Sequence, residues 1–444
     1  MNIKEKAKNF AIRAHAGQVR KSDPGKPMII HPINVGNILN EYGFDDNVIS
    51  AGYLHDVVED TKYKFSDIVD NFGDDIASLV EGASEPDKSL SWEVRKEHTI
   101  SSIKELDLRH KAIICADKIS NLEDLHILFG ISGKKDFSKF KRGFDKQKWY
   151  YEGVYYSLIL NEDESFPMFV RLKELIDYVF NDKCDNFIKN EIFKDNSLYY
   201  DELVKINFRN DEIFKLNSVL CNRRPFVIEF TGTPRTGKTS LINNLYDFFK
   251  KKGFSVVVLE EFTTSKKYKE EIFPSLKGKS KKIINTEIPK YVYEQLNDAM
   301  SGDYEIILVD RSLFDRLIWA DRLYLMDGFS LDEYNDYIDK YISVIKNNID
   351  IIIGTYVDSI TALRRDYFAH LSLGKRSFLN ISNIDSYNKS FFRMKDLAFR
   401  EKINFYDFNT FNKSMNDVSF EVVNVLLSHM KETYIKRIFD EFDM

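Results

Sequence analysis

The sequence reads Phe226-Val227-Ile228-Glu229-Phe230-Thr231 and continues as Gly232-Thr233-Pro234-Arg235-Thr236-Gly237-Lys238-Thr239. Residues 226–230 of the first part form a short β-rich run typical of a buried strand, and the second part fits the pattern GxxxxGK followed by Ser or Thr. A helical run, residues 240–251, comes next. Strand, glycine-containing loop and helix in this order predict a phosphate-binding loop, in which backbone N–H groups at a helix N-terminus face the ligand.

Apolar runs of the same kind recur after this loop. They cover residues 254–259, 304–309, 350–353 and 403–406, with longer helical patterns between them. Strands that alternate with helices predict a parallel sheet covered on both faces. Together with residues 226–230, these runs predict an α/β domain with a five-stranded parallel sheet over residues 223–444.

The chain before residue 222 differs from the rest in its histidine content and in the period of its apolar residues. Six of the eight histidines fall at or before position 126, and residues 47–60, 111–125 and 148–160 have helical rather than alternating patterns. We therefore expect an all-α domain over residues 1–185, followed by a partly helical linker over residues 186–222.

One block of this first domain places a histidine next to an aspartate, at His55-Asp56. His31 and Asp117 offer a second imidazole and a second carboxylate. Such a mixed nitrogen and oxygen set suits Mn²⁺, Fe²⁺ or Zn²⁺, and a metal bound by it can activate water and hold a phosphate oxygen. The alternative for each histidine alone is a hydrogen-bonded core residue.

Two further acids follow on the same predicted helix. Glu59 and Asp60 lie four positions after His55 and Asp56, so each shares a helix face with one of the pair. At that distance from a metal site, a carboxylate can orient or deprotonate a bound water.

Four blocks resemble, in order and spacing, the hydrolase domain of the RelA/SpoT alarmone family. They are His15-Ala16-Gly17-Gln18-Val19-Arg20-Lys21, Ile30-His31-Pro32, Leu54 to Thr61, and Ala116-Asp117-Lys118-Ile119-Ser120-Asn121-Leu122. The resemblance covers residues 1–180 and implies an all-helical metal-dependent phosphohydrolase that removes the 3′-pyrophosphate of guanosine tetra- and pentaphosphate.

The resemblance also implies roles for single residues. It implies Mn²⁺ ligands at His31, His55, Asp56 and Asp117, and water activation by Glu59 and Asp60. It implies nucleotide contacts at Arg20, Lys21 and Asn121. One departure leaves the substrate open, because Met28 stands where the family usually has Tyr. Arg95 and Lys96 either contact phosphates or lie on a solvated helix face.

The second domain has its own candidate residues. Lys238 is placed to bridge the β- and γ-phosphates of ATP, and Thr239 to ligate Mg²⁺. Asp310 ends one predicted strand as a second Mg²⁺-holding acid, with Arg311 after it. Glu261, with Glu260 as the alternative, is the candidate base, and Arg365, next to Arg364, is the candidate lid arginine.

These pieces resemble the thymidylate-kinase and deoxynucleoside-kinase branch of P-loop proteins, over residues 224–410. The resemblance implies ATP-dependent phosphoryl transfer to a small acceptor. The lid carries no clear signature, and the acceptor stays open.

Composition and charge restrict the classes of protein to which the chain could belong. The 64 basic and 70 acidic residues give a net charge of −6, which disfavours a nucleic-acid target. The three cysteines, Cys115, Cys184 and Cys221, show no CxxC pair, and no apolar run is long enough for a membrane helix. We expect a cytoplasmic enzyme acting on small nucleotides, with its oligomeric state open.

The sequence supports three functional interpretations. The first is a bifunctional enzyme, a Mn²⁺-dependent hydrolase fused to an ATP-dependent kinase. In the second, the P-loop domain is a regulatory ATPase that gates the hydrolase. The third is a binding protein that senses alarmone without cleaving it, although the full set of ligands and water-activating acids disfavours this interpretation.

Overall fold

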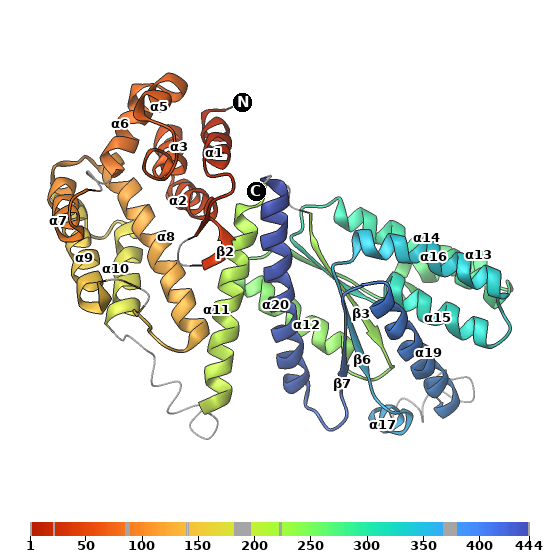
Figure 1. The fold of residues 1–444 in the computed structure, drawn as a ribbon. Helices are drawn as coiled ribbons and strands as arrows, with labels where there is room; N and C mark the ends of the chain where they lie inside the picture. The colour runs from red at the N-terminus through yellow and green to blue at the C-terminus, as the bar shows by residue number, and fades with distance from the viewer. Residues whose placement is uncertain are drawn as a thin grey trace. The chain divides into compact units, whose positions relative to one another are not determined.

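The computed structural model describes residues 2–20, 23–84, 89–138, 140, 142–181, 197–221, 224–366 and 380–442. The chain divides into two compact units (Figure 1). Unit 1 comprises Met1–Asn222 together with Lys431–Met444, and unit 2 comprises Arg223–Met430. The last residues were predicted to belong to the second domain, and the structure corrects this, because they pack with unit 1.

Unit 1 is mostly helical, as predicted. Its main helices are α1 (Ile3–Ala14), α2 (Ile30–Glu41), α3 (Asp46–Leu54), α4 (Val57–Asp60), α5 (Phe65–Phe72), α6 (Asp74–Ala83), α7 (Trp92–Ser102), α8 (Leu108–Ser132), α9 (Gly143–Leu158), α10 (Pro167–Phe180) and α11 (Ser197–Val219). A short antiparallel hairpin, β1 (Val19–Arg20) with β2 (Asp23–Pro27), departs from the all-α expectation. Pro24 and Gly25 lie within β2, where they favour a turn over a helix.

Helix α11 occupies part of the segment predicted as a linker, and residues 182–196 lie outside the described part. The end of α20 (Met415–Glu441) packs against α11: Lys431 pairs with Glu212 at 3.0 Å, and the Cys221 N–H donates to Glu441 Oε1 at 2.9 Å. Among the helices described, none is both long and apolar enough to cross a membrane.

Unit 2 contains the predicted five-stranded parallel sheet. Its strands are β3 (Phe226–Gly232), β4 (Val256–Leu259), β5 (Ile306–Asp310), β6 (Ile351–Tyr356) and β7 (Phe405–Asn409), in the order β4-β5-β3-β6-β7. Strand β3 is central and pairs on one side with β5 (Phe226 opposite Ile306) and on the other with β6 (Ile228 opposite Ile351). The loop after β3 therefore emerges at the carboxyl edge of the sheet, where α/β proteins bind ligands.

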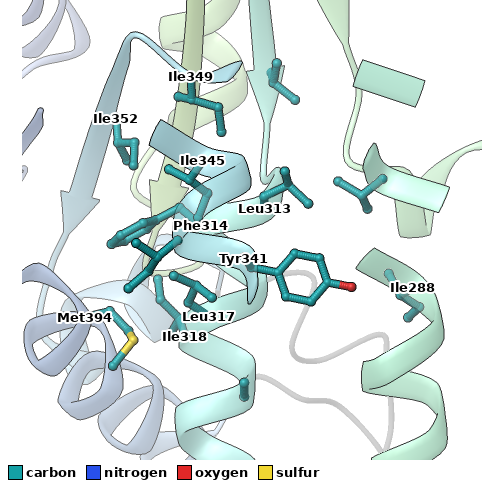
Figure 2. Packing of buried hydrophobic residues seen from close by; sticks show 14 of the residues in the cluster. Ile288, Leu313, Phe314, Leu317, Ile318, Tyr341, Ile345, Ile349, Ile352 and Met394 are labelled. Atoms are coloured by element: carbon teal, nitrogen blue, oxygen red, sulfur yellow. The ribbon is translucent and has the colours of Figure 1, made fainter. Parts of the chain in front are cut away.

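Helices cover both faces of this sheet (Figure 1). They are α12 (Lys238–Lys252), α14 (Lys281–Met300), α15 (Leu313–Leu325), α16 (Leu331–Asn348), α17 (Ser359–Arg365), α19 (Ile381–Arg400) and the first part of α20. Figure 2 shows the core on one face, where Phe314 and Leu317 of α15 pack with Ile345 of α16, Ile352 of β6 and Met394 of α19. Burial of these apolar side chains fixes α15 at the carboxyl end of β5.

Candidate functional site

Three segments of unit 1 bring the predicted metal ligands together. His31 lies in the first turn of α2, His55 and Asp56 lie between α3 and α4, and Asp117 lies inside α8. His31 Nε2 is 3.1 Å from Asp117 Oδ1 and 3.6 Å from Asp56 Oδ2, and His55 Nε2 is 3.2 Å from Asp56 Oδ1. One donor atom from each of His31, His55 and Asp117 lies within 4.8 Å of the other two, a spacing suited to a shared cation.

The expected helix over residues 47–60 is interrupted at this point. Helix α3 ends at Leu54 and α4 starts at Val57, so that His55 and Asp56 lie in a turn between them. In an uninterrupted helix, adjacent side chains point about 100° apart. His55 and Asp56 keep right-handed helical dihedral angles at the break, and their side chains still converge, with His55 Nε2 3.2 Å from Asp56 Oδ1.

Hydrogen bonds orient the two imidazoles. His31 Nδ1 is 3.1 Å from Ser120 Oγ, and His55 Nδ1 is 2.9 Å from the Gly52 carbonyl oxygen. The Gly52 carbonyl oxygen can only accept, so His55 Nδ1 is the donor and Nε2 of that ring is left to bind a cation. The tautomer of His31 in which Nδ1 donates to Ser120 Oγ leaves its Nε2 for the same role. His55 Nε2 is buried and has no hydrogen-bond partner among the described residues, which fits a metal-binding role.

The charges around the cluster keep Asp117 ionised. Burial alone opposes ionisation, but Lys118 and His31 hold the pKa of Asp117 well below its usual range. Lys118 Nζ lies 2.5 Å from Asp117 Oδ2, and Asn121 Nδ2 donates to Oδ1 at 2.6 Å. An anionic carboxylate with two buried imidazoles is a donor set that fits Mn²⁺, Fe²⁺ or Zn²⁺.

Two glycines allow α2 and α3 to approach closely enough to form this cluster. A Cβ on Gly36 would lie 2.2 Å from a ring carbon of Tyr53, and one on Gly52 would lie 2.4 Å from a methyl carbon of Leu39 and 3.4 Å from the Gly36 Cα. The contact therefore sets the separation of the helices that carry His31 and His55.

We expect Gly36→Ala to lower the free energy of unfolding by about 1–3 kcal/mol, because overpacking the Tyr53 ring outweighs the helix-propensity gain of about 1 kcal/mol. The affinity for Mn²⁺ should fall as well, since the two imidazoles move apart. Urea denaturation and calorimetric Mn²⁺ titration measure both effects. Asn40→Ala, an exposed change on the same helix, is the control, and equal stability of the two variants would contradict the expectation.

The cluster opens into a cavity of about 630 Å³. Among the described residues, its lining comprises Gln18, Val19, Arg20, Met28, His31, Asp56, Asp60, Trp92, Lys96, Asp117, Lys118, Asn121, Phe140, Gln147, Tyr150 and Tyr151. Besides His31, this lining includes the following site residues predicted from the sequence: Arg20, Asp56, Asp60, Lys96, Asp117 and Asn121. Basic, aromatic and amide side chains thus surround the acids.

Other predicted residues lie elsewhere. Glu59 and Arg95 are not among the described residues that line the cavity, and Lys21 lies outside the described part of the chain. Helix α7 presents Trp92 and Lys96, four residues apart, to the cavity, and this spacing directs Arg95 to another face. Asp60 is held through its carbonyl oxygen, which accepts from Gln18 Nε2 at 2.8 Å.

One wall of the cavity was not predicted from the sequence. Lys118, Gln147, Tyr150 and Tyr151 line it, and Lys96 lies over the Tyr150 ring at 4.4 Å. The spacing 147, 150, 151 marks one face of a helix and was the signal that could have indicated this wall. That this face of α9 meets the cavity follows only from tertiary packing.

The P-loop of unit 2 follows β3. A Cβ on Gly232, whose φ is +128°, would lie 1.8 Å from the Thr355 carbonyl oxygen, so only glycine fits there. Lys238 Nζ donates to the carbonyl oxygens of Gly232 at 3.2 Å and Thr233 at 3.0 Å. Burial and the nearby Arg311 charge lower the pKa of Lys238 to about 7.

The loop forms one side of a cavity of about 460 Å³. The described lining residues are Pro234, Arg235, Gly237, Lys238, Thr239, Ser240, Glu261, Asp310, Arg311, Trp319 and Tyr387. Thr239 Oγ1 donates to Asp310 Oδ2 at 3.3 Å, and Asp310 Oδ1 is buried without a hydrogen-bond partner among the described residues. A hydroxyl and a carboxylate so placed fit Mg²⁺. Three other residues of the loop are not among the described residues that line this cavity, namely Gly232, Thr233 and Thr236.

Arg311 is anchored by residues that were not predicted from the sequence. Its Nη1 donates to Asp315 Oδ1 at 2.8 Å and to Tyr387 Oη at 3.1 Å, and its Nη2 to the Gly232 carbonyl oxygen at 2.9 Å. Burial opposes ionisation of Asp315, but Arg311 and Arg316 hold its pKa well below the usual range. Arg311 thus connects the P-loop to α15 and α19.

The structure distinguishes the two candidate bases, and it places both candidate lid arginines away from the cavity lining. Glu261 lines the cavity and lies 3.4 Å from Arg311 Nε, whereas Glu260 is exposed and is not among the described lining residues. Arg365 donates to the Thr410 carbonyl oxygen at 2.6 Å and to Thr410 Oγ1 at 2.9 Å. Arg364 is exposed, and neither arginine belongs to the described lining.

Comparisons with known proteins bear on both units. Residues 7–129 match the family model described as HD domain. The guanosine-3′,5′-bis(diphosphate) 3′-pyrophosphohydrolase MESH1 of Xenopus tropicalis is 38% identical over 121 residues, which cover 27% of this chain and 67% of that protein.

A probable guanosine-3′,5′-bis(diphosphate) 3′-pyrophosphohydrolase of Synechocystis is 38% identical over 125 residues, 27% of this chain and 16% of that protein. The chain thus spans about a sixth of the length of this longer relative. The solved structure of deoxyadenosine kinase from M. mycoides matches with 20% identity and a TM-score of 0.32, and the match covers 46% of this chain and 99% of that one.

Proposed function

Because the chain belongs, through its N-terminal unit, to the HD-domain family that includes the guanosine-3′,5′-bis(diphosphate) 3′-pyrophosphohydrolases, we propose that unit 1 is a Mn²⁺-dependent (p)ppGpp 3′-pyrophosphohydrolase. The observation that carries the proposal is the cluster of His31, His55, Asp56 and Asp117, of which all but His55 line a cavity that also has basic side chains in its lining. A phosphorylated nucleotide suits such a cavity, since cations and aromatic rings bind phosphates and bases.

Different residues of the cavity would serve metal binding, proton transfer and nucleotide binding. A divalent ion held by the cluster would polarise a phosphate oxygen and lower the pKa of a bound water. Asp60 lines the cavity and is the better placed of the two acids to take the proton of the attacking water at its carboxylate. Arg20, Lys96 and Lys118 would bind phosphate oxygens, with Lys96 held over the Tyr150 ring at 4.4 Å, and Tyr151 would contact the base.

Product analysis on the purified full chain tests this proposal. With Mn²⁺ and guanosine tetraphosphate, we expect release of pyrophosphate and formation of GDP. A panel of other nucleotides runs in parallel. Cleavage of a different nucleotide alone would keep the metal mechanism and discard the alarmone substrate, and absence of any cleavage would favour the sensing interpretation.

For unit 2 we propose ATP–Mg²⁺ binding and transfer of the γ-phosphoryl group to a small acceptor. The support is the P-loop with Lys238, Thr239 and Asp310 in one cavity, and Glu261 beside it as a base for the acceptor hydroxyl. Arg311 would stabilise charge on the transferring group. Because Arg365 contacts Thr410 instead of lining the cavity, its predicted lid role requires a rearrangement.

Binding of ATP should take up a proton in alkaline solution. The pKa of Lys238 is lowered to about 7 without nucleotide, and an adjacent polyphosphate raises it again. We expect uptake of about one proton at a pH of about 8.5 and almost none at about 6, where Lys238 is already protonated. Calorimetry in buffers of different ionisation enthalpy measures the uptake, and equal values at both pH values would contradict the expectation.

A regulatory ATPase is the alternative for unit 2. It predicts slow ATP turnover that no nucleoside or nucleotide acceptor increases. The placement of Glu261 and Arg311 around the same cavity favours the kinase, because a switch needs no base for an acceptor. ATP turnover measured with an acceptor panel separates the two.

A further inference from the structure

Helix α11 contributes to the surroundings of the nucleotide cavity, although it lies outside the residues that match the HD-domain family. Lys215, near its end, donates from Nζ to Asp124 Oδ1 at 2.6 Å and to the Ser120 carbonyl oxygen at 3.2 Å. The second oxygen of Asp124, Oδ2, accepts from Arg20 Nη2 at 2.7 Å. Arg20 in turn lines the cavity.

These three side chains form a row of cation, anion and cation that is largely shielded from water. The exposed fraction is 11% for the side chain of Arg20, 32% for Asp124 and 14% for Lys215. Although burial opposes its ionisation, the charges of Lys215 and Arg20 lower the pKa of Asp124 to about 2. At neutral pH the carboxylate is therefore charged, and each of its oxygens has a cationic partner.

The division of Asp124 between two cations decides how strongly it holds Arg20. A guanidinium and a carboxylate alone favour a bidentate pair, which engages two N–H donors. Lys215 occupies Oδ1, so Arg20 meets the carboxylate through Nη2 on Oδ2. Glu123, 3.6 Å from Lys215, and Lys26, which acts on Asp124 by its charge alone, also contribute to the local field.

We propose that Lys215 is a positioning residue for the substrate of unit 1. By binding one oxygen of Asp124, it keeps Arg20 turned with its remaining donors toward the cavity. The segment after the HD domain is then part of the nucleotide-binding apparatus, and this inference rests on the proposed hydrolase function. Asp124 and Lys215 are not members of the metal cluster, and Lys215 is connected to it only through Ser120, whose carbonyl oxygen it contacts and whose hydroxyl lies 3.1 Å from His31 Nδ1. The main effect of the pair is therefore on binding of the nucleotide.

Lys215→Met in the full chain tests the proposal. We expect KM for guanosine tetraphosphate to rise roughly five- to tenfold, as for weakening of one charged hydrogen bond, with kcat within about twofold of wild type. The Kd of the same nucleotide for metal-free protein should rise by the same factor. Lys215→Arg should restore both values. Lys205→Met is the matched control, because Lys205 lies on the same helix and pairs with Glu202.

A double-mutant cycle with Asp124→Asn distinguishes an effect on KM that acts through Asp124 from one caused by general destabilisation of the protein. Lys215→Met should have no further effect on KM once Asp124 is neutral, whereas a loss through general destabilisation would persist. An unchanged KM and Kd in Lys215→Met, or a fall in kcat alone, would overturn the inference while leaving the hydrolase proposal intact. A wild-type chain that neither binds nor cleaves guanosine tetraphosphate would overturn both.

Discussion

Asp56→Asn should lower the rate of nucleotide hydrolysis by unit 1 by about a thousandfold or more. The substitution keeps the shape of the side chain but removes the negative charge that lies 3.2 Å from His55 Nε2 and 3.6 Å from His31 Nε2. A metal contributes several kcal/mol to stabilising a phosphoryl transition state, and about 1.4 kcal/mol corresponds to a factor of ten. Initial rates of pyrophosphate release at saturating Mn²⁺ measure the loss.

Asp46→Asn is the matched control for this variant. Asp46 is an exposed acid at the start of α3 that pairs with Lys4 at 2.9 Å, and such surface pairs contribute little. Its activity should stay near that of wild type. Full hydrolysis by Asp56→Asn, with unchanged Mn²⁺ affinity, would mean that the cluster is not the catalytic centre.

Lys238→Met should reduce ATP turnover by unit 2 by roughly a hundred- to thousandfold. Lys238 is the buried cation of the P-loop, 3.0 Å and 3.2 Å from two loop carbonyl oxygens that it would leave to bind phosphate. Removing one preorganised donor to a transferring phosphoryl group has an effect of about this size. Because the pKa of Lys238 is about 7, Met also removes the cost of burying an ammonium group.

The stability of Lys238→Met therefore separates function from folding. Without nucleotide it should be as stable as wild type, or more stable, while ATP should no longer raise its melting temperature. Lys251→Met, at an exposed position near the end of the same helix, serves as the control. Wild-type turnover in Lys238→Met would refute the assignment of the P-loop as the ATP site.

Local pattern was sufficient to predict the fold of unit 2. Each strand is a short apolar run, and each lies between helical segments, so parallel pairing followed from length and order alone. The end of β3 was predicted two residues early, because Thr231 is polar and Gly232 opens the phosphate-loop pattern, yet both residues pair with β6. The position of Arg365 on Thr410 was not predictable, because it depends on a contact 45 residues away along the chain.

The site of unit 1 was only partly predictable. The candidate ligands followed from residue type and from the resemblance, and the structure brings three of them, His31, His55 and Asp117, together. The turn at His55 and Asp56 was missed, because the apolar pattern of residues 47–60 continues across it. The wall from α9 and the contact of Lys215 were missed because each depends on helices that are distant in sequence.

The return of α20 to unit 1 has a consequence for synthesis on the ribosome. Glu212 and Cys221 of unit 1 are made long before Lys431 and Glu441, their partners on α20. Between them the ribosome makes all of unit 2, Arg223–Met430. Unit 1 therefore emerges first but is completed last, and a nascent chain that stalls within unit 2 exposes the surface of α11 that the end of α20 covers.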